Sequence, residues 1–278
     1  MRIIPAAAIE DVVARLVIEA NVTLPVDIRE AVRTAIPTET GAARAALEAI
    51  DENSELAETL QMPVCQDTGM AAVFLEIGCD AHIGGNVTDA VNRGVARGYA
   101  DGFLRKSIVA DPLRRTNTGD NRPAALTIDI TDGDAVRITV APKGFGSENM
   151  SRVKMLRPSD GLAGVVDFVL ETVELAGGNP CPPIVVGVGI GANFDKVAQL
   201  AKRALLRPIT ERNADEYYAT LETELLSKIN ALGIGPQGFG GRTTALGVNV
   251  LAAPTHIAGL PVAVCISCHV TRHCTEVI

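Results

Sequence analysis

Hydrophobic and polar positions in the N-terminal part of the chain recur at helical spacing, and prolines interrupt the pattern. The apolar positions follow a period near 3.6 residues in the ranges 9–18, 26–36 and 43–60. Pro25 and Pro37 lie between these ranges, where a proline can begin a helix but disrupts one that is already formed. The pattern therefore predicts three helices within residues 1–60.

Beyond residue 60 the pattern alternates between strands and helices. Short apolar runs predict buried strands at 71–78, 182–191, 245–253 and 260–267. Helical periods recur at 88–104, 158–176, 193–206 and 213–231. This order predicts a mixed α/β (α+β) fold in which N-terminal helices are followed by mixed sheet segments packed with helices, as one domain over 1–278.

Two local patterns add detail to this prediction. Residues 125–143 form two alternating segments around Asp132, Gly133 and Asp134, which predicts a β-hairpin. Three glycines recur every fourth residue along the helix predicted at 88–104, and they predict close packing against a neighbour. They are Gly94, Gly98 and Gly102.

Composition and charge exclude several classes of partner. The net charge is −8, which opposes nonspecific binding to nucleic acid or to an anionic membrane, since both require a basic surface. Hydrophobic residues make up 47% and aromatic residues 3%, so aliphatic side chains must fill the core. An anionic substrate would have to meet locally placed arginine or lysine side chains.

The N-terminal segment contains charges that a secretory leader would lack. Glu10, Asp11 and Arg15 interrupt its apolar stretch. No apolar run approaches the roughly 20 residues that cross a bilayer. We therefore expect a cytoplasmic protein.

Six cysteines are too few for a disulfide scaffold in a chain of 278 residues, so free thiols in a reducing compartment are expected. Cys65, Cys181 and Cys268 each lie at the boundary of a predicted element. Thiolates from three loops could hold a four-iron cluster with one iron open to substrate. Asp67, two residues after Cys65, would then lie close enough to handle a proton.

The C-terminal segment offers a different metal hypothesis. Its cysteines and histidines are the ligand types of zinc, which would make the chain a zinc-binding, non-enzymatic module. The residues are Cys265, Cys268, His269, His273 and Cys274. However, Cys265 and Cys268 should project to opposite faces unless the strand ends at Ser267, so we interpret Cys265 as core and Cys268 as the available thiolate.

A third hypothesis concerns the strand, glycine turn and predicted helix around residue 190. Gly189 and Gly191 begin a dinucleotide-binding fingerprint, but Phe194 stands where the third glycine is needed. No convincing acidic residue follows about 20 positions later. The glycines are better explained by a tight turn with close packing of the backbone.

Several motifs together resemble the α part of class I fumarases and L(+)-tartrate dehydratases. The resemblance covers essentially the whole chain, and the motifs occur in order. They are CQDTG at 65–69, KGFGSENMSRVKML at 143–156, CPPIVVGVGIG at 181–191, AKRALLRPI at 201–209, IGPQGFGGRTTALGVNV at 234–250 and HIAGLPVAVCISC at 256–268.

The resemblance implies a [4Fe-4S] cluster held by Cys65, Cys181 and Cys268, with the open iron acting as a Lewis acid. Asp67 and His256 are the implied catalytic residues. The implied substrate contacts are Gln66, Asp67, Arg105, Lys143, Gly144, Gly146, Ser147 and Asn149. Cys79, Cys265 and Cys274 have no role in the family and are interpreted as structural.

The resemblance also implies a partner and a reaction. The chain ends soon after Cys268, so the β-type domain is expected on a separate chain, in an α2β2-like hetero-oligomer. Residues 141–151 are similar to the corresponding stretch of fumarases, which favours reversible hydration of fumarate to (S)-malate, a step of the tricarboxylic acid cycle. Dehydration of L(+)-tartrate to oxaloacetate is the alternative, and mesaconate is a further possible substrate. The carbon-acid base cannot be named from this chain and is expected on the β chain.

Overall fold

The computed structural model describes residues 2–278, whose contacts divide the chain into two compact units. Unit 1 consists of the residues up to Leu24, Ser54–Phe145 and Arg272–Ile278. Unit 2 consists of Pro25–Asn53 and Gly146–Thr271. Each unit is therefore built from segments that are distant in the sequence, and we describe each by itself.

The three predicted N-terminal helices are present and are shared between the units. They are α1 (Ala6–Val22), α2 (Val26–Ala35) and α3 (Gly41–Leu60), with the short 3₁₀ helix η1 (Ile36–Thr38) before α3. Pro25 is the N-cap of α2, as expected for a residue that can precede a helix but not continue one. α1 belongs to unit 1 and α2 to unit 2, and the division between the units falls within α3.

Unit 1 is built around a four-stranded mixed sheet with the strand order β10-β5-β2-β4. Its strands are β2 (Met70–Gly78), β4 (Ala125–Thr131), β5 (Val136–Lys143) and β10 (Cys274–Val277). A parallel pair, β1 (Arg2–Pro5) with β3 (Ala81–Gly84), forms a second sheet. Apolar side chains of α1 and α4 (Val87–Asp101) pack with those of β2 and β5 in one core cluster. β1, β3 and β10 were not predicted from the sequence.

The predicted hairpin at 125–143 is wrong, although both strands exist. β4 and β5 do not pair with each other, because β2 lies between them, parallel to β4 and antiparallel to β5. Gly78 permits this insertion, since a Cβ there would lie 2.3 Å from the carbonyl oxygen of Gly133. β2 is the more apolar strand and takes the central position, whereas Ile128 and Ile130 of β4 remain exposed at the edge.

The glycines of α4 serve the close packing that their spacing predicts. A Cβ at Gly94 would lie 2.7 Å from the carbonyl oxygen of Glu10, and one at Gly98 would lie 2.7 Å from that of Ala14. Both partners belong to α1. The two helices can therefore approach until their backbones touch.

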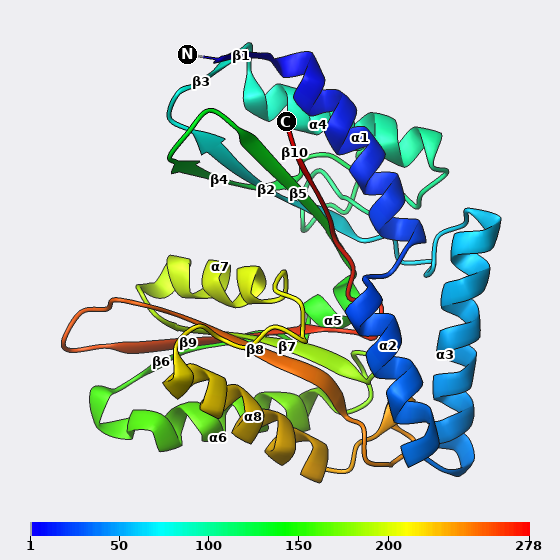
Figure 1. The fold of residues 1–278 in the computed structure, drawn as a ribbon, viewed down its shortest axis with the longest axis vertical. Coiled ribbons are helices and arrows are strands. Elements are labelled where there is room, and N and C mark those ends of the chain that lie inside the picture. Colours follow the sequence, from blue (N-terminus) through cyan, green and yellow to red (C-terminus); the bar gives the residue numbers. More distant parts are fainter. Residues whose placement is uncertain (1) are drawn as a thin grey trace. The chain divides into compact units, whose positions relative to one another are not determined.

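Unit 2 contains a second four-stranded sheet, with the order β6-β9-β7-β8. Its strands are β6 (Arg152–Leu156), β7 (Ile184–Gly191), β8 (Ala245–Ala253) and β9 (Leu260–Ser267). α7 (Phe194–Ala204) covers one face, and α6 (Gly161–Ala176) and α8 (Glu216–Ala231) cover the other (Figure 1). The shorter elements are α5 (Phe145–Glu148), η2 (Pro158–Asp160) and η3 (Pro236–Gly238). Together the two units confirm the predicted mixed α/β class, and β6 is a further strand that was not predicted.

The glycines of β7 are explained by packing rather than by a nucleotide. A Cβ at Gly187 would lie 2.1 Å from the carbonyl oxygen of Ala201, and one at Gly189 would lie 2.3 Å from that of Val197. The backbone of α7 therefore rests directly on β7. Asn193 caps α7 by accepting a hydrogen bond from the backbone N–H of Lys196.

Within residues 2–278, none of the helices combines the length and apolar character needed to cross a membrane.

Candidate functional site

The turn that carries Cys65 leads into β2 of unit 1 and is held by buried side chains. The hydroxyl of Tyr99 lies 2.7 Å from the carbonyl oxygen of Thr68 and 2.8 Å from that of Gly69. Asn121 donates its side-chain N–H to the same oxygen of Gly69, at 3.1 Å. Tyr99 and Asn121 are fully buried, and burial raises the pKa of Tyr99 above its ordinary value. The end of the turn is thus fixed by polar groups without access to water, while Cys65 is half-buried.

Asp67 connects this turn to the loop that follows β5. Its Oδ1 accepts a hydrogen bond from the backbone N–H of Gly69 at 3.0 Å, and its Oδ2 accepts one from that of Phe145 at 2.9 Å. The guanidinium of Arg272 donates to the Asp67 carbonyl oxygen at 2.6 Å. Gly69 has φ +72°, and a Cβ there would lie 2.6 Å from the carbonyl carbon of Lys143. Unit 1 therefore brings Asp67 together with Lys143 and its neighbour Gly144.

The segment that carries Arg105 is joined to the same turn. Thr68 donates its hydroxyl to the carbonyl oxygen of Arg105 at 3.0 Å. The Oδ1 of Asn121 accepts hydrogen bonds from the backbone N–H groups of Ser107, at 2.6 Å, and Ile108, at 3.1 Å. Asn121 thus fixes both the turn and this loop. The side chains of Arg105 and Gln66 are exposed.

In unit 2, sheet topology brings Cys181 and Cys268 to one end of the sheet. β7 begins shortly after Cys181, and β9, which is antiparallel to β7, ends just before Cys268. His269, which follows Cys268, contacts the Cys181 segment directly, since its Nδ1 lies 2.9 Å from the carbonyl oxygen of Cys181. Cys181 has φ +55°, an uncommon conformation for a residue with a side chain. The side chain of Cys181 is exposed, and that of Cys268 is half-buried.

The loop before β6 reaches the same end of this sheet. A Cβ at Gly146 would lie 4.0 Å from the carbonyl oxygen of Asn179, two residues before Cys181. The Ser151 hydroxyl accepts a hydrogen bond from the backbone N–H of Ile266 in β9, at 3.1 Å. Between these contacts Ser147 is buried and Asn149 is exposed, and Glu148 forms an ion pair with Lys202.

His256 lies at the opposite end of the same sheet. It follows β8, which is parallel to β7, so it lies beyond the carboxyl ends of both strands. Cys181 precedes β7, and the length of these strands corresponds to a separation of roughly 25 Å. The His256 side chain is exposed, and its Nδ1 accepts a hydrogen bond from the backbone N–H of Ala258 at 3.2 Å. Within one chain the fold does not bring His256 together with Cys181 and Cys268.

Two of the remaining cysteines, Cys265 and Cys274, lie within strands, whereas Cys79 is exposed. Cys265 is buried in β9, where its Sγ lies 3.7 Å from the Ser151 hydroxyl, and β9 ends at Ser267. This confirms Cys265 as core and separates its thiol from Cys268. Cys274 belongs to β10 of unit 1, where burial and the nearby Glu19 raise the pKa of its thiol to about 12. Across residues 2–278, no three His, Cys, Asp or Glu side chains form a group that could hold a metal ion.

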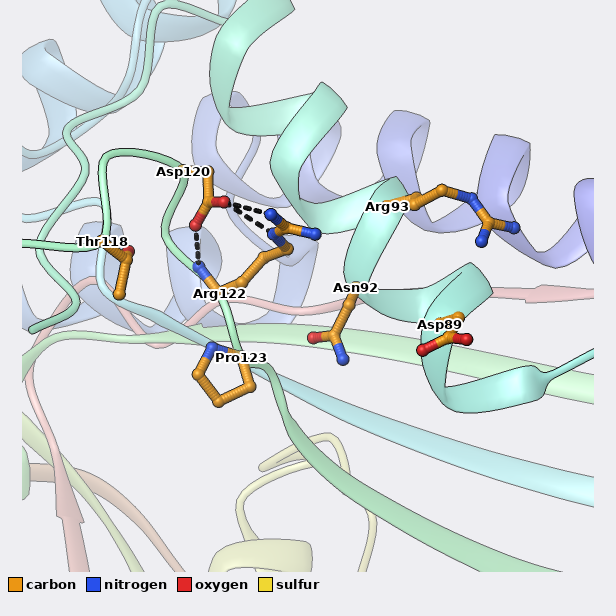
Figure 2. A pocket seen from close by; sticks show the side chains of 7 residues that line it. All are labelled: Asp89, Asn92, Arg93, Thr118, Asp120, Arg122 and Pro123. Carbon is orange, nitrogen blue, oxygen red and sulfur yellow. Dashed lines mark hydrogen bonds and ion pairs between the residues drawn. The ribbon is translucent and has the colours of Figure 1, made fainter. Parts of the chain in front are cut away.

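A surface pocket in unit 1 lies apart from the predicted site residues. Its volume is about 480 Å³. Figure 2 shows its lining residues: Asp89, Asn92, Arg93, Thr118, Asp120, Arg122 and Pro123. Asp120 accepts hydrogen bonds from the Nε of Arg122 at 2.7 Å and from its backbone N–H at 3.1 Å, and the side-chain bond lowers the pKa of Asp120. None of the predicted site residues lines this pocket.

The sequence analysis missed the residues that position the two thiol-bearing regions. Tyr99 and Asn121 lie 30 and 52 residues from Gly69, whose carbonyl oxygen they contact. Gln237 contacts Pro182 across 55 residues. The signal in the sequence is a polar residue among residues of another kind, such as Gln237 within a glycine-rich loop.

Comparison with known proteins assigns the chain to a family. The sequence model described as Fumarate hydratase (Fumerase) matches residues 10–277. A chain from Methanocaldococcus jannaschii, provisionally named L(+)-tartrate dehydratase subunit alpha, is 46% identical over 272 residues, which cover 95% of each chain. The L(+)-tartrate dehydratase subunit alpha of Escherichia coli K12 is 36% identical over 228 residues, covering 81% of this chain and 75% of that one. The protein of the same name from Shigella sonnei matches to the same extent. The chain therefore belongs to the fumarase family of iron–sulfur hydro-lyases.

Proposed function

We propose that the chain is the α subunit of a two-subunit hydro-lyase that dehydrates L(+)-tartrate to oxaloacetate. The observation that carries the proposal is its alignment over 95% of both chains with a relative named as that subunit. The relatives from E. coli and S. sonnei carry the same name. Residues 141–151 alone favoured fumarate as the substrate, and the names of the relatives weigh against that preference. Hydration of fumarate is the second candidate, which the name of the family model supports.

We propose that Cys65, Cys181 and Cys268 hold a [4Fe-4S] cluster. The donor chemistry fits, since all three thiols are free of disulfides and none is fully buried. Two of them lie at one end of the unit 2 sheet, and the third lies on a turn fixed by buried groups. When bound, such a cluster supplies an iron that lacks a protein ligand and acts as a Lewis acid toward the substrate hydroxyl.

The chain's own contribution would be to bind the dianion and move a proton. Arg105 and Lys143 are cations in an acidic chain, and an arginine can bind a carboxylate through two parallel hydrogen bonds. We propose that Gln66, Gly144, Gly146, Ser147 and Asn149 complete the contacts. Asp67 is proposed to give a proton to the departing hydroxyl. Each of its oxygens keeps a lone pair beyond its backbone hydrogen bond, so the carboxylate can first take up the proton that it then donates.

The first experiment is an activity assay of the chain purified anaerobically with its candidate β subunit, using L(+)-tartrate and fumarate as separate substrates. A higher kcat/KM for L(+)-tartrate would support the proposal, whereas turnover of fumarate alone would favour the second candidate.

Asp67→Asn should lower kcat by about 10²–10⁴-fold if Asp67 transfers the proton. Asp111→Asn is the matched control, because Asp111 also caps a turn in unit 1, accepting from the backbone of Leu113 and Arg114. Equal activity of both variants would remove Asp67 from the reaction.

A further inference from the structure

Three segments that are distant in the sequence meet at the end of the unit 2 sheet where Cys181 and Cys268 lie. The first runs through Cys181 to Pro183 into β7, the second is the glycine-rich loop at 233–244 before β8, and the third leaves β9 at Cys268. Backbone pairing fixes the strands but not the loops beyond them. Any fixed spacing of the two thiols therefore depends on contacts among the three segments.

Gln237 of the second segment fastens the first. Its backbone N–H donates to the carbonyl oxygen of Pro182 at 2.7 Å, and its side-chain N–H donates to the same oxygen at 2.8 Å. The two consecutive prolines make a second attachment valuable, since neither Pro182 nor Pro183 has an N–H with which to anchor the loop. One side chain thus doubles the connection between the two segments.

The backbone conformation of Gln237 is uncommon for a residue with a side chain. Its φ is +53°, in the left-handed region that glycine adopts at least cost. The neighbouring left-handed positions, Gly235, Gly238 and Gly240, are all glycines. A glutamine adopts this conformation at a conformational cost, and its side-chain hydrogen bond to Pro182 offsets part of that cost.

His269 fastens the third segment to the first. Its Nδ1 lies 2.9 Å and its backbone N–H nitrogen 3.4 Å from the carbonyl oxygen of Cys181. A carbonyl oxygen only accepts hydrogen bonds, so Nδ1 carries the proton in this contact. The Gln237 side-chain nitrogen lies 3.3 Å from the same Nδ1 and packs beside it, while one of its two N–H groups donates to Pro182.

We infer that Gln237 and His269 are positioning residues that hold the Cys181 loop against the segment carrying Cys268 and so fix the spacing of the two thiols. The role of this fixed spacing rests on the proposed function, because it would serve a cluster bound by both thiolates. We call these contacts of Gln237 and His269 the clamp. The clamp is present in the protein without a cluster. It can therefore be tested separately.

The first test measures amide hydrogen exchange in the metal-free full chain. Gln237→Ala should speed exchange at the His269 backbone N–H about fivefold, and His269→Ala should do the same at the Gln237 backbone N–H. The effect across segments is diagnostic, because a purely local role would change exchange only beside the substitution. His269→Asn, which keeps a side-chain N–H, should restore part of the protection. Gln199→Ala and His82→Ala, which alter exposed residues, should leave both amides unchanged.

The second test measures the loss of iron to a chelator after anaerobic reconstitution with iron and sulfide. Gln237→Ala and His269→Ala should retain iron about 10-fold less well than the wild type, as expected when residues that orient metal ligands are removed. If the exchange rates at the His269 and Gln237 backbone N–H groups are unchanged in these variants, the clamp does not exist. If exchange is faster but iron retention is unchanged, the clamp exists but does not serve the cluster. If the wild-type chain takes up no iron while the exchange effect is present, the proposed function fails and the clamp stands.

Discussion

The two thiol-bearing regions of this protein are positioned by different means. In unit 1, the turn with Cys65 is fixed by side chains, since Tyr99 and Asn121 bind its carbonyl oxygens. In unit 2, sheet register brings Cys181 and Cys268 to one end, and contacts of Gln237 and His269 then hold the loops that carry them. The first region should therefore be sensitive to the loss of single buried polar groups. The second should be sensitive to changes that disturb strand and helix packing, and its loops to the loss of the Gln237 or His269 side chain.

The largest effects are expected where a side chain would collide with the backbone. Gly69→Ala would place a Cβ 2.6 Å from Lys143 at φ +72°, and Gly187→Ala would place one 2.1 Å from the carbonyl oxygen of Ala201. We expect each to lower the free energy of unfolding by about 3–5 kcal/mol, measured by urea denaturation. Hydrogen exchange should assign the first loss to unit 1 and the second to unit 2. Gly133→Ala has a positive φ but open space around the Cβ, so a smaller loss there is the control.

A smaller effect is expected at the glycine-rich loop of unit 2. Glu39 is 4% exposed, and its Oε1 accepts hydrogen bonds from the backbone N–H groups of Arg242 and Thr243 at 2.8 and 2.6 Å. Glu39→Ala leaves both donors without this partner and should cost about 2–3 kcal/mol by urea denaturation. Glu39→Gln keeps an accepting oxygen and should cost less. If both variants are as stable as the wild type, this loop does not depend on a buried side chain.

The smallest effect of the series concerns Tyr99. Tyr99→Phe removes the donor to Thr68 and Gly69 and should cost about 1–2 kcal/mol. Because burial raises the pKa of Tyr99, the folded chain keeps a proton that the unfolded chain releases above about pH 10. The stability of the wild type should therefore fall as the pH rises from 10, and less steeply in Tyr99→Phe.

Urea midpoints at pH 9 and 11 measure this difference, with the exposed Tyr217→Phe as control. An identical alkaline loss in Tyr99→Phe and the wild type would show that Tyr99 does not hold the turn through a buried hydroxyl.

Patterns of short range in the sequence predicted most elements of the fold. The strands at 245–253 and 260–267 and the glycine spacing of α4 can be read from neighbouring residues, and the structure has the strands and the close packing where they were expected. The hairpin at 125–143 was wrong because strand pairing is a long-range property, and β2 competes for the central position. The short strands β1 and β10 carry too few residues to show a period.

The candidate site was predictable only in part for the same reason. The placement of Cys181, Cys265 and Cys268 followed from where strands begin and end. The position of His256 at the far end of the sheet depends on the parallel pairing of β7 and β8, which no local pattern encodes. The contacts of Gln237 likewise require the loops to be assembled first.

The measurement that tests the account most directly is the iron and sulfide content of the reconstituted chain with its β subunit, in cysteine variants, alongside turnover of L(+)-tartrate. We predict that Cys65→Ala, Cys181→Ala and Cys268→Ala each lose the intact cluster and the activity. Cys79→Ala, at an exposed position, and Cys265→Ala, in the core of β9, should retain both. Retention of the cluster in any of the first three variants, or zinc bound in place of iron, would contradict the proposed ligand set.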